Sequence, residues 1–170
     1  GSVRAKEVLP TPRQDPSALA STMRTVLSRA ETPVAGAVVG LPGPIDYAAG
    51  EVLNLPNLPD WLGHISAASH AKEIGLPVLL ANDADLTALG EHRYGAGAGS
   101  RDMLYVTCST GVGVGVILNG RLLRGRLSLA EVGHTIIDCA TGRTVESFGS
   151  GSALARMAEE DAASVSAKAR

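Results

Sequence analysis

The chain has 170 residues, of which 45% are hydrophobic, 3% aromatic and 19% charged, and its formal net charge is −2. This composition excludes a strongly basic nucleic-acid or membrane-surface module and is far from that of a disordered chain. No apolar run approaches the roughly 20 residues that cross a bilayer. The two cysteines, Cys108 and Cys139, are too few for a disulfide framework. We therefore expect a soluble, cytoplasmic α/β domain.

The first hundred residues alternate between helix and strand patterns. Asp15 can cap a helix in which Pro16 takes the first position, and Gly75 can end a later helix in the left-handed conformation. The predicted order is a helix at 16–30, a strand at 34–39, a helix at 60–73, a strand at 77–81 that leads into the polar residues 82–85, and a third helix that includes Leu86 and runs to Gly95. Because the two strands are joined through a helix, we expect them to pair in parallel.

The remaining residues change character. Two apolar segments, at 103–108 and 112–118, flank a short glycine-containing turn, and Asn119-Gly120 is a strong signal for a hairpin into a third strand at 121–123. This pattern predicts an antiparallel meander and, with the parallel pair, a mixed sheet with flanking helices. A last, alanine-rich helix is predicted at 151–161.

The turn of the meander is rich in glycine, with alternating glycines from Gly111 to Gly115 after Thr110. Such a turn lets backbone N–H groups approach an anion. A dinucleotide fingerprint would open a helix and a P-loop would carry Gly-Lys-Ser/Thr, so both are excluded here. Two interpretations stay open: a phosphate loop within a β-hairpin, or close backbone packing within a sheet.

Two further groups of polar residues could carry chemistry. Asn82 and Asp83 follow a buried strand, at the edge where open α/β sheets bind ligands, although Asp83 could simply cap the next helix. Glu131 and His134 are three residues apart with a glycine between them, a pair that is also common on ordinary surfaces. The other three histidines, His64, His70 and His92, show no pattern, and we expect them to be exposed on helices.

Together, six blocks resemble the ROK family of sugar kinases and sugar-responsive repressors over roughly residues 8–160. In chain order they are Gly-Leu-Pro-Gly-Pro-Ile-Asp at 40–46, Asn-Leu-Pro-Asp-Trp at 57–61, Asn-Asp-Ala-Asp at 82–85, Ser-Thr-Gly-Val-Gly-Val-Gly at 109–115, Asn-Gly-Arg at 119–121 and Glu-Val-Gly-His at 131–134. The resemblance implies an actin-like, ribonuclease H-like α/β fold. Residues 1–100 would form most of its N-terminal lobe, and residues 101–170 would begin the second lobe.

The resemblance also implies a role for each matching position. Asp83 matches the general base that takes a proton from a sugar hydroxyl, with ATP and Mg²⁺ supplying the phosphoryl group. The implied sugar contacts are Gly43, Asn57, Asn82, Glu131, His134 and Glu146, and the implied phosphate contacts are Thr110, Gly111 and Gly113. The implied substrate is a hexose or an N-acylated hexosamine, and the implied assembly is a homodimer.

The chain departs from the family pattern in two main ways. The Asp-x-Gly-Gly-Thr hairpin that holds Mg²⁺ and phosphate is absent, and the cysteine-rich zinc loop is shortened, so that Glu146 follows a remnant of it. His134 and Cys139 would supply only two of the four ligands of a structural zinc, so we expect no zinc. The 170 residues therefore look like the middle of a longer protein, and we expect no kinase activity from them alone.

Three functions follow from these observations. The leading one is a sugar kinase of the ROK type, with the reaction belonging to the intact protein. The second is the sugar-sensing domain of a ROK repressor, which would bind sugar without turning it over and would contact DNA only through an upstream helix-turn-helix. The third is a non-catalytic scaffold or dimerisation module.

Overall fold

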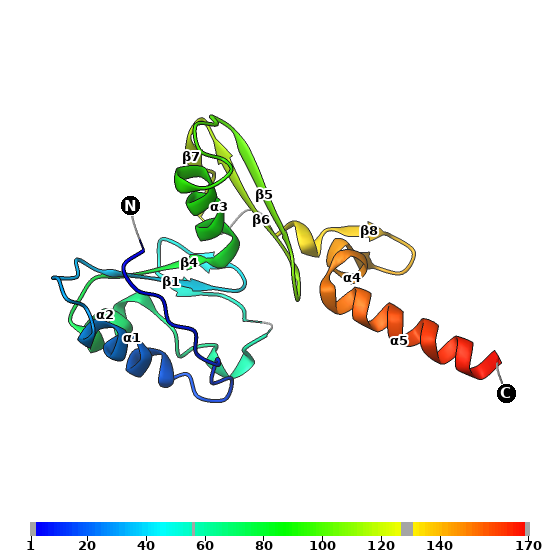
Figure 1. The fold of residues 1–170 in the computed structure, drawn as a ribbon, viewed down its shortest axis with the longest axis horizontal. Helices are drawn as coiled ribbons and strands as arrows, with labels where there is room; N and C mark the ends of the chain where they lie inside the picture. Colours follow the sequence, from blue (N-terminus) through cyan, green and yellow to red (C-terminus); the bar gives the residue numbers. More distant parts are fainter. Residues whose placement is uncertain (1–2, 56, 127–130, 169–170) are drawn as a thin grey trace. The chain divides into compact units, whose positions relative to one another are not determined.

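The computed structural model describes residues 3–55, 57–126 and 131–168 (Figure 1). These residues divide into two compact units. The first runs to Leu86 and includes the segment that begins at Arg124, and the second holds Thr87–Leu123 and the remainder of the chain. The boundary lies within one helix, α3 (Asp83–Tyr94). The predicted division into lobes at residue 100 concerns the intact fold and stays a prediction.

The first unit is built around a parallel pair of strands, β1 (Ala37–Leu41) and β4 (Val78–Asn82), with Leu41 opposite Asn82. Two helices, α1 (Ala18–Ser28) and α2 (Ala67–Ile74), lie on one side of this pair (Figure 1). Their apolar residues cover a core of Leu41, Ile45, Val52, Leu55, Leu58, Trp61, Ile65, Val78 and Leu80. The predicted parallel pairing is confirmed.

The segment between the two strands differs from the single helix predicted at 60–73. Only a 3₁₀ turn, η1 (Pro59–Trp61), forms at its start. Gly63 then has φ +80°, a left-handed conformation that interrupts a helix. The α-helix begins after Ser66, whose hydroxyl accepts a hydrogen bond from the Ser69 N–H at 3.1 Å. The prediction of one continuous helix is wrong because the chain turns at Gly63 and is capped anew.

Two further features of this unit depart from the sequence prediction. A short hairpin of β2 (Ile45–Asp46) and β3 (Glu51–Val52) follows the proline-rich loop after β1. His70, expected to be exposed, is only 3% exposed, and its Nδ1 lies 2.9 Å from the carbonyl oxygen of Ser66. That prediction is wrong because His70 lies on the face of α2 that packs inward, where a local hydrogen bond satisfies its ring.

The second unit contains the predicted meander. Strands β5 (Met103–Cys108), β6 (Val112–Leu118) and β7 (Arg121–Leu122) pair in antiparallel order. Asn119 and Gly120 both have positive φ, +52° and +73°, as a two-residue hairpin with the right twist requires. The meander and its hairpin turn are confirmed.

The chain beyond the meander forms two short strands and two helices. They are preceded by the 3₁₀ turn η2 (Val132–His134), and in order they are β8 (Ile136–Asp138), β9 (Arg143–Thr144), α4 (Val145–Gly149) and α5 (Gly151–Lys168). The helix α5 begins where the sequence predicted it and extends further. Among the described residues, no helix combines the length and the apolar character that crossing a membrane requires.

Candidate functional site

The carboxyl ends of β1 and β4 bring two predicted sugar-binding residues together. Asn82 is only 8% exposed, and its Nδ2 donates a hydrogen bond to the carbonyl oxygen of Gly43 at 3.2 Å. Its Oδ1 accepts from the backbone N–H groups of Ala84 at 3.0 Å and Asp85 at 3.2 Å. Asn82 therefore joins the loop after β1 to the first turn of α3 and caps that helix.

Asp83, the predicted general base, follows Asn82 directly and is the first residue of α3. Its side chain is exposed, and its Oδ1 accepts a hydrogen bond from the Ala84 N–H at 2.8 Å. The exposed carboxylate therefore lies at the positive end of a helix, beside a buried, fixed amide. Asn57, another predicted sugar contact, is exposed in the loop between β3 and η1.

A half-buried tyrosine and a buried carboxylate lie next to this pair, and the sequence prediction did not include them. The Tyr47 hydroxyl donates to Asp85 Oδ2 at 2.7 Å, and the Asn82 N–H points to the same hydroxyl at 3.5 Å. Asp85 is 2% exposed, and this burial raises its pKa above the ordinary value. Burial and the bond to Asp85 raise the pKa of Tyr47 to about 12. The phenol is therefore the proton donor of the pair at neutral pH.

The chain segment after β7 packs against the same residues. The Arg124 guanidinium carbon lies 5.1 Å from the centroid of the Tyr47 ring, which is a cation–π distance. The Tyr47 N–H donates to the Arg126 carbonyl oxygen at 3.2 Å, and the Arg126 guanidinium lies 3.3 Å from Asp46 Oδ2. Asp46 also accepts from the N–H groups of Ala49 and Ala48, and these bonds, with Arg126, lower its pKa.

In the second unit, Glu146 contacts the glycine-rich turn. Its Oε2 accepts a hydrogen bond from the Val112 N–H at 2.9 Å. A Cβ on Gly111 would clash with the same carboxylate, and one on Gly133 would clash with the carbonyl oxygen of Val112. The absence of side chains at Gly111 and Gly133 is therefore what lets Glu146, the turn and η2 lie together.

The turn itself meets the start of a long helix. The Ser109 N–H donates to the Gly111 carbonyl oxygen at 2.8 Å, and the Gly151 N–H donates to the Ser109 carbonyl oxygen at 2.6 Å. Thr110 is exposed at the tip. The turn thus lies at the positive N-terminal end of the 18-residue helix α5. Gly113 lies within β6 opposite Thr107.

Glu131 directly precedes the 3₁₀ turn η2, and His134 is its last residue. Glu131 Oε2 and His134 Nε2 are 3.8 Å apart, and His134 is the more exposed of the two, at 59% of its side chain. Both could contact a hydroxylated ligand, since together they offer an acceptor and a donor. The described ranges contain no cluster of three His, Cys, Asp or Glu side chains that could hold a metal ion.

The predicted site residues are distributed between the two units. Gly43, Asn57, Asn82 and Asp83 lie in the first, and the structure brings Gly43, Asn82 and Asp83 together there. Thr110, Gly111, Gly113, Glu131, His134 and Glu146 lie in the second, where Glu146 joins the glycine-rich turn. Tyr47 and Asp85 were missed because only the pairing of distant strands makes them neighbours, although Asp85 stands in the Asn-Asp-Ala-Asp block itself.

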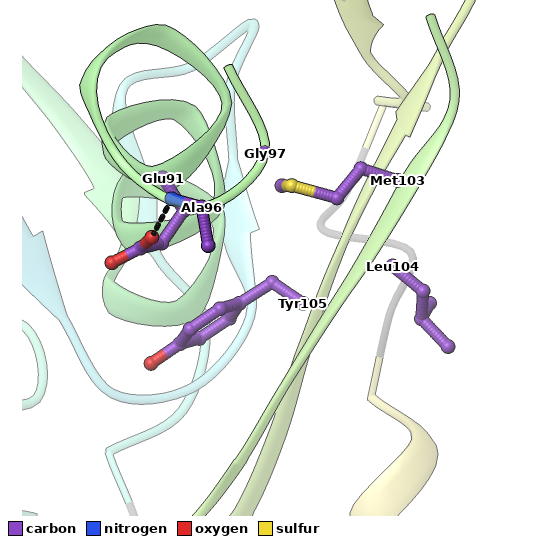
Figure 2. Close-up of a pocket in the computed structure, with 6 residues that line it drawn as sticks. All are labelled: Glu91, Ala96, Gly97, Met103, Leu104 and Tyr105. Atoms are coloured by element: carbon purple, nitrogen blue, oxygen red, sulfur yellow. Dashed lines mark hydrogen bonds between the residues drawn. The ribbon is translucent and has the colours of Figure 1, made fainter. Parts of the chain in front are cut away.

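The second unit also contains a pocket of about 310 Å³ that involves none of the predicted site residues. Figure 2 shows Met103 and Tyr105 pointing from β5 toward the end of α3, where Glu91 Oε2 accepts from the Ala96 N–H at 2.9 Å. Leu104 points from the opposite face of the strand (Figure 2). The pocket is mostly apolar and separate from Glu146 and the turn.

Comparison with known proteins gives a consistent result. The model of the ROK family matches residues 1–169. The chain is 37% identical over 150 residues to a glucokinase of Thermotoga maritima, a match that covers 84% of this chain and 47% of the relative. It is 34% identical over 141 residues to a xylose repressor of Caldicellulosiruptor bescii, which covers 77% of this chain and 35% of the relative.

Among solved structures, the chain is similar to a ROK family glucokinase from Streptomyces griseus in complex with glucose and AMPPNP. The TM-score is 0.75 and the sequences are 31% identical, over 89% of this chain and 52% of that one. The chain thus spans about half the length of the curated relatives it matches. On these matches and on the fold described above, the chain belongs to the ROK family and has part of its actin-like, ribonuclease H-like α/β fold.

Proposed function

We propose that the intact protein containing this chain is a sugar kinase that transfers the γ-phosphoryl group of ATP to a hydroxyl of a hexose or an N-acylated hexosamine. The observation that carries the proposal is the arrangement of Asn82 and Asp83. The amide of Asn82 is buried and bonded to Gly43, and the carboxylate beside it is exposed at the edge of the β1–β4 pair. Similarity to a glucokinase of Thermotoga maritima supports it.

Asp83 would act as the general base. A sugar hydroxyl within hydrogen-bond reach of its carboxylate would lose its proton to Asp83 as the oxygen attacks the γ-phosphorus of ATP. A carboxylate can accept this proton only if it is accessible, and Asp83 is exposed. Asn82 would contact the sugar or hold the loop at Gly43 against it, since its side chain is fixed at both ends.

The turn at Thr110 and Gly111 is the proposed phosphate contact. Its exposed threonine offers a hydroxyl, and the N-terminal end of α5 at Gly151 favours negative charge nearby. The Val112 N–H already donates to Glu146, so the phosphate would meet the tip of the turn and not its base. No Asp-x-Gly-Gly-Thr, the motif that would hold Mg²⁺ in the family pattern, occurs in the 170 residues.

The remaining sugar contacts are also proposed. Glu131 and His134 would bind ring hydroxyls as acceptor and donor, and Asn57 would approach from the loop after β3. Glu146 would bind sugar only by the carboxylate oxygen that does not hold Val112. A cytoplasmic location and a homodimeric assembly stay predictions.

The test is a kinase assay of the intact protein with ATP and Mg²⁺ over a panel of hexoses and N-acylated hexosamines. We expect turnover of at least one sugar, and we expect Asp83→Asn to lower kcat by at least about 10²-fold while leaving sugar affinity within a few-fold. Asp60→Asn, which changes another exposed aspartate, is the matched control. Normal turnover by Asp83→Asn would show that Asp83 is not the general base.

A second candidate function is a sugar-binding repressor domain, which the similarity to the xylose repressor of Caldicellulosiruptor bescii favours. Such a protein would bind sugar without transferring phosphate. It would differ in the assay, because sugar would change its affinity for DNA while ATP would not be consumed. An upstream helix-turn-helix in the intact protein would favour the repressor, and an upstream Asp-x-Gly-Gly-Thr hairpin would favour the kinase.

A further inference from the structure

Tyr47 and Asp85 form a hydrogen-bonded polar pair in the first unit. The Tyr47 hydroxyl and Asp85 Oδ2 are 2.7 Å apart, although the two residues are separated by 38 positions in the chain. Asp85 is 2% exposed, so its carboxylate depends on protein donors in place of water. The phenol therefore supplies a hydrogen bond that this buried carboxylate needs, and surface packing alone does not account for its position.

The pair is linked to the proposed base through Asn82. Asp85 donates its N–H to Asn82 Oδ1 at 3.2 Å, and the Asn82 N–H points to the Tyr47 hydroxyl at 3.5 Å. Together with the Tyr47–Asp85 bond, they form a closed ring of hydrogen bonds that joins the last residue of β4 to the first turn of α3. Asp83 lies in the chain between Asn82 and Asp85, so its backbone position depends on both of these residues.

Tyr47 is itself held from the other side. The Arg124 guanidinium lies over its ring at 5.1 Å from the centroid, and its N–H donates to the Arg126 carbonyl oxygen at 3.2 Å. The titratable and charged groups that face Asp85 are therefore Tyr47, Arg124 and, on its own helix, Asp83. A tyrosine held by a cation–π contact to its ring and by a hydrogen bond from its backbone can keep its hydroxyl in one place, as a positioning residue must.

We propose that Tyr47 is a positioning residue for the sugar kinase reaction, which holds Asp85 and Asn82 so that the Asp83 carboxylate is aimed at the sugar hydroxyl. This inference rests on the proposed function. Tyr47 does not touch the reacting atoms; it acts through the hydrogen bond to Asp85 and the contact with the Asn82 N–H. Its loss should therefore affect turnover more than sugar binding.

The test compares four variants of the intact protein. Tyr47→Phe keeps the ring under Arg124 and removes only the hydroxyl, Asp85→Ala removes the acceptor, and Asp85→Asn keeps an acceptor oxygen. Tyr94→Phe removes the hydroxyl of an exposed tyrosine at the end of α3 and is the matched control. The readouts are kcat and KM for the sugar, and hydrogen exchange at the Ala84 and Asp85 amides, which donate to Asn82 Oδ1.

We expect Tyr47→Phe and Asp85→Ala each to lower kcat about tenfold, with KM changed less than about threefold and with several-fold faster exchange at the two amides. Asp85→Asn should retain most of kcat, and Tyr94→Phe should match the wild type. Unchanged exchange in Tyr47→Phe would overturn the proposal whether or not the protein is a kinase. Faster exchange with unchanged kcat, or equal losses in Asp85→Asn and Asp85→Ala, would also overturn it.

The failure of the proposed function has a separate signature. A wild-type protein that binds glucose or a related sugar but transfers no phosphate would end the kinase proposal, and the effect of Tyr47 on Asp85 and Asn82 would then be read from hydrogen exchange at the Ala84 and Asp85 amides. Tyr47→Phe should still speed that exchange several-fold while sugar affinity changes less than about threefold, and unchanged exchange would overturn the role. A wild type that binds none of these sugars would overturn both proposals.

Discussion

Glu146 accepts a hydrogen bond from the backbone N–H of Val112, with 2.9 Å between Glu146 Oε2 and the nitrogen. The carboxylate is half-buried on the first turn of α4, which a capping box of Thr144 and Ser147 begins. This one bond joins α4, which directly follows β9, to the base of the glycine-rich turn. A residue expected from the sequence to contact sugar therefore also has a structural partner.

Removing that carboxylate should loosen the turn. We expect Glu146→Ala to lower the free energy of unfolding by about 1–2 kcal/mol, since a bond between a charged acceptor and a backbone donor is lost. Glu146→Gln should cost less, because an amide oxygen can still accept from Val112. Urea denaturation measures both, with Glu159→Ala on the exposed face of α5 as the control. An alanine variant as stable as the control would show that the bond contributes nothing.

The close approach at η2 makes a second prediction. A Cβ on Gly133 would meet the carbonyl oxygen of Val112, which is backbone and cannot move aside as a flexible side chain can. We expect Gly133→Ala to destabilise the protein by about 1–3 kcal/mol. Gly90→Ala, at an exposed helical position with nothing within 4 Å of the added carbon, should stabilise by about 0.5–1 kcal/mol. Thermal unfolding compares them, and equal midpoints would contradict the packing argument.

The bond between Asn82 and Gly43 can be removed without removing the helix cap. In Asn82→Asp one oxygen still accepts from Ala84 and Asp85, but the group that donated to the Gly43 carbonyl becomes an acceptor facing an acceptor. We expect a loss of about 1–3 kcal/mol in the free energy of unfolding. Asn54→Asp, at an exposed position, is the control. If the two variants unfold at the same denaturant concentration, the bond to Gly43 does not contribute to stability.

Asp85 predicts a dependence of stability on pH. Burial raises its pKa above the ordinary 3.8, so the folded state binds its proton more tightly than the unfolded state does. The contribution of Asp85 to the free energy of unfolding is therefore largest below pH 3.8, and it falls as the pH rises through the pKa of the folded state. Asp85→Asn removes the titration. It should be more stable than the wild type at neutral pH, and the difference should shrink toward acid pH.

Denaturation curves of Asp85→Asn and the wild type between pH 3 and pH 7 check this prediction. A stability difference that does not change with pH would show that the burial of Asp85 does not govern its titration. Asp102→Asn is the control, since Asp102 is exposed in the turn before β5. The same Asp85→Asn protein serves in the kinase comparison, so one preparation tests both.

Most elements could be predicted because their signals are local. Caps, glycine stops and apolar periodicity mark α1, β1, β4 and α3, and Asn119-Gly120 marks the hairpin of the meander. The order of the polar blocks was enough to indicate the ROK family, which the family model confirms over residues 1–169. Such signals act between residues a few positions apart, so a single sequence contains them in full.

The errors came where the fold overrides local pattern. Gly63 interrupts a helix that Asp60 could have begun, and α4 was missed because its five residues are too few to show a period. His70 was expected to be exposed, but it is buried on the inward face of α2. Each outcome depends on what a segment packs against.

By itself, then, the sequence determined the family, the order of most elements and the candidate residues at 82–83, 110–113, 131–134 and 146. Only the tertiary structure decided their partners: Asn82 with Gly43, Tyr47 with Asp85, and Glu146 with Val112. These pairs are 34 to 39 residues apart in the chain. Strand register and the docking of helices bring them together, and no local preference of the backbone specifies such contacts.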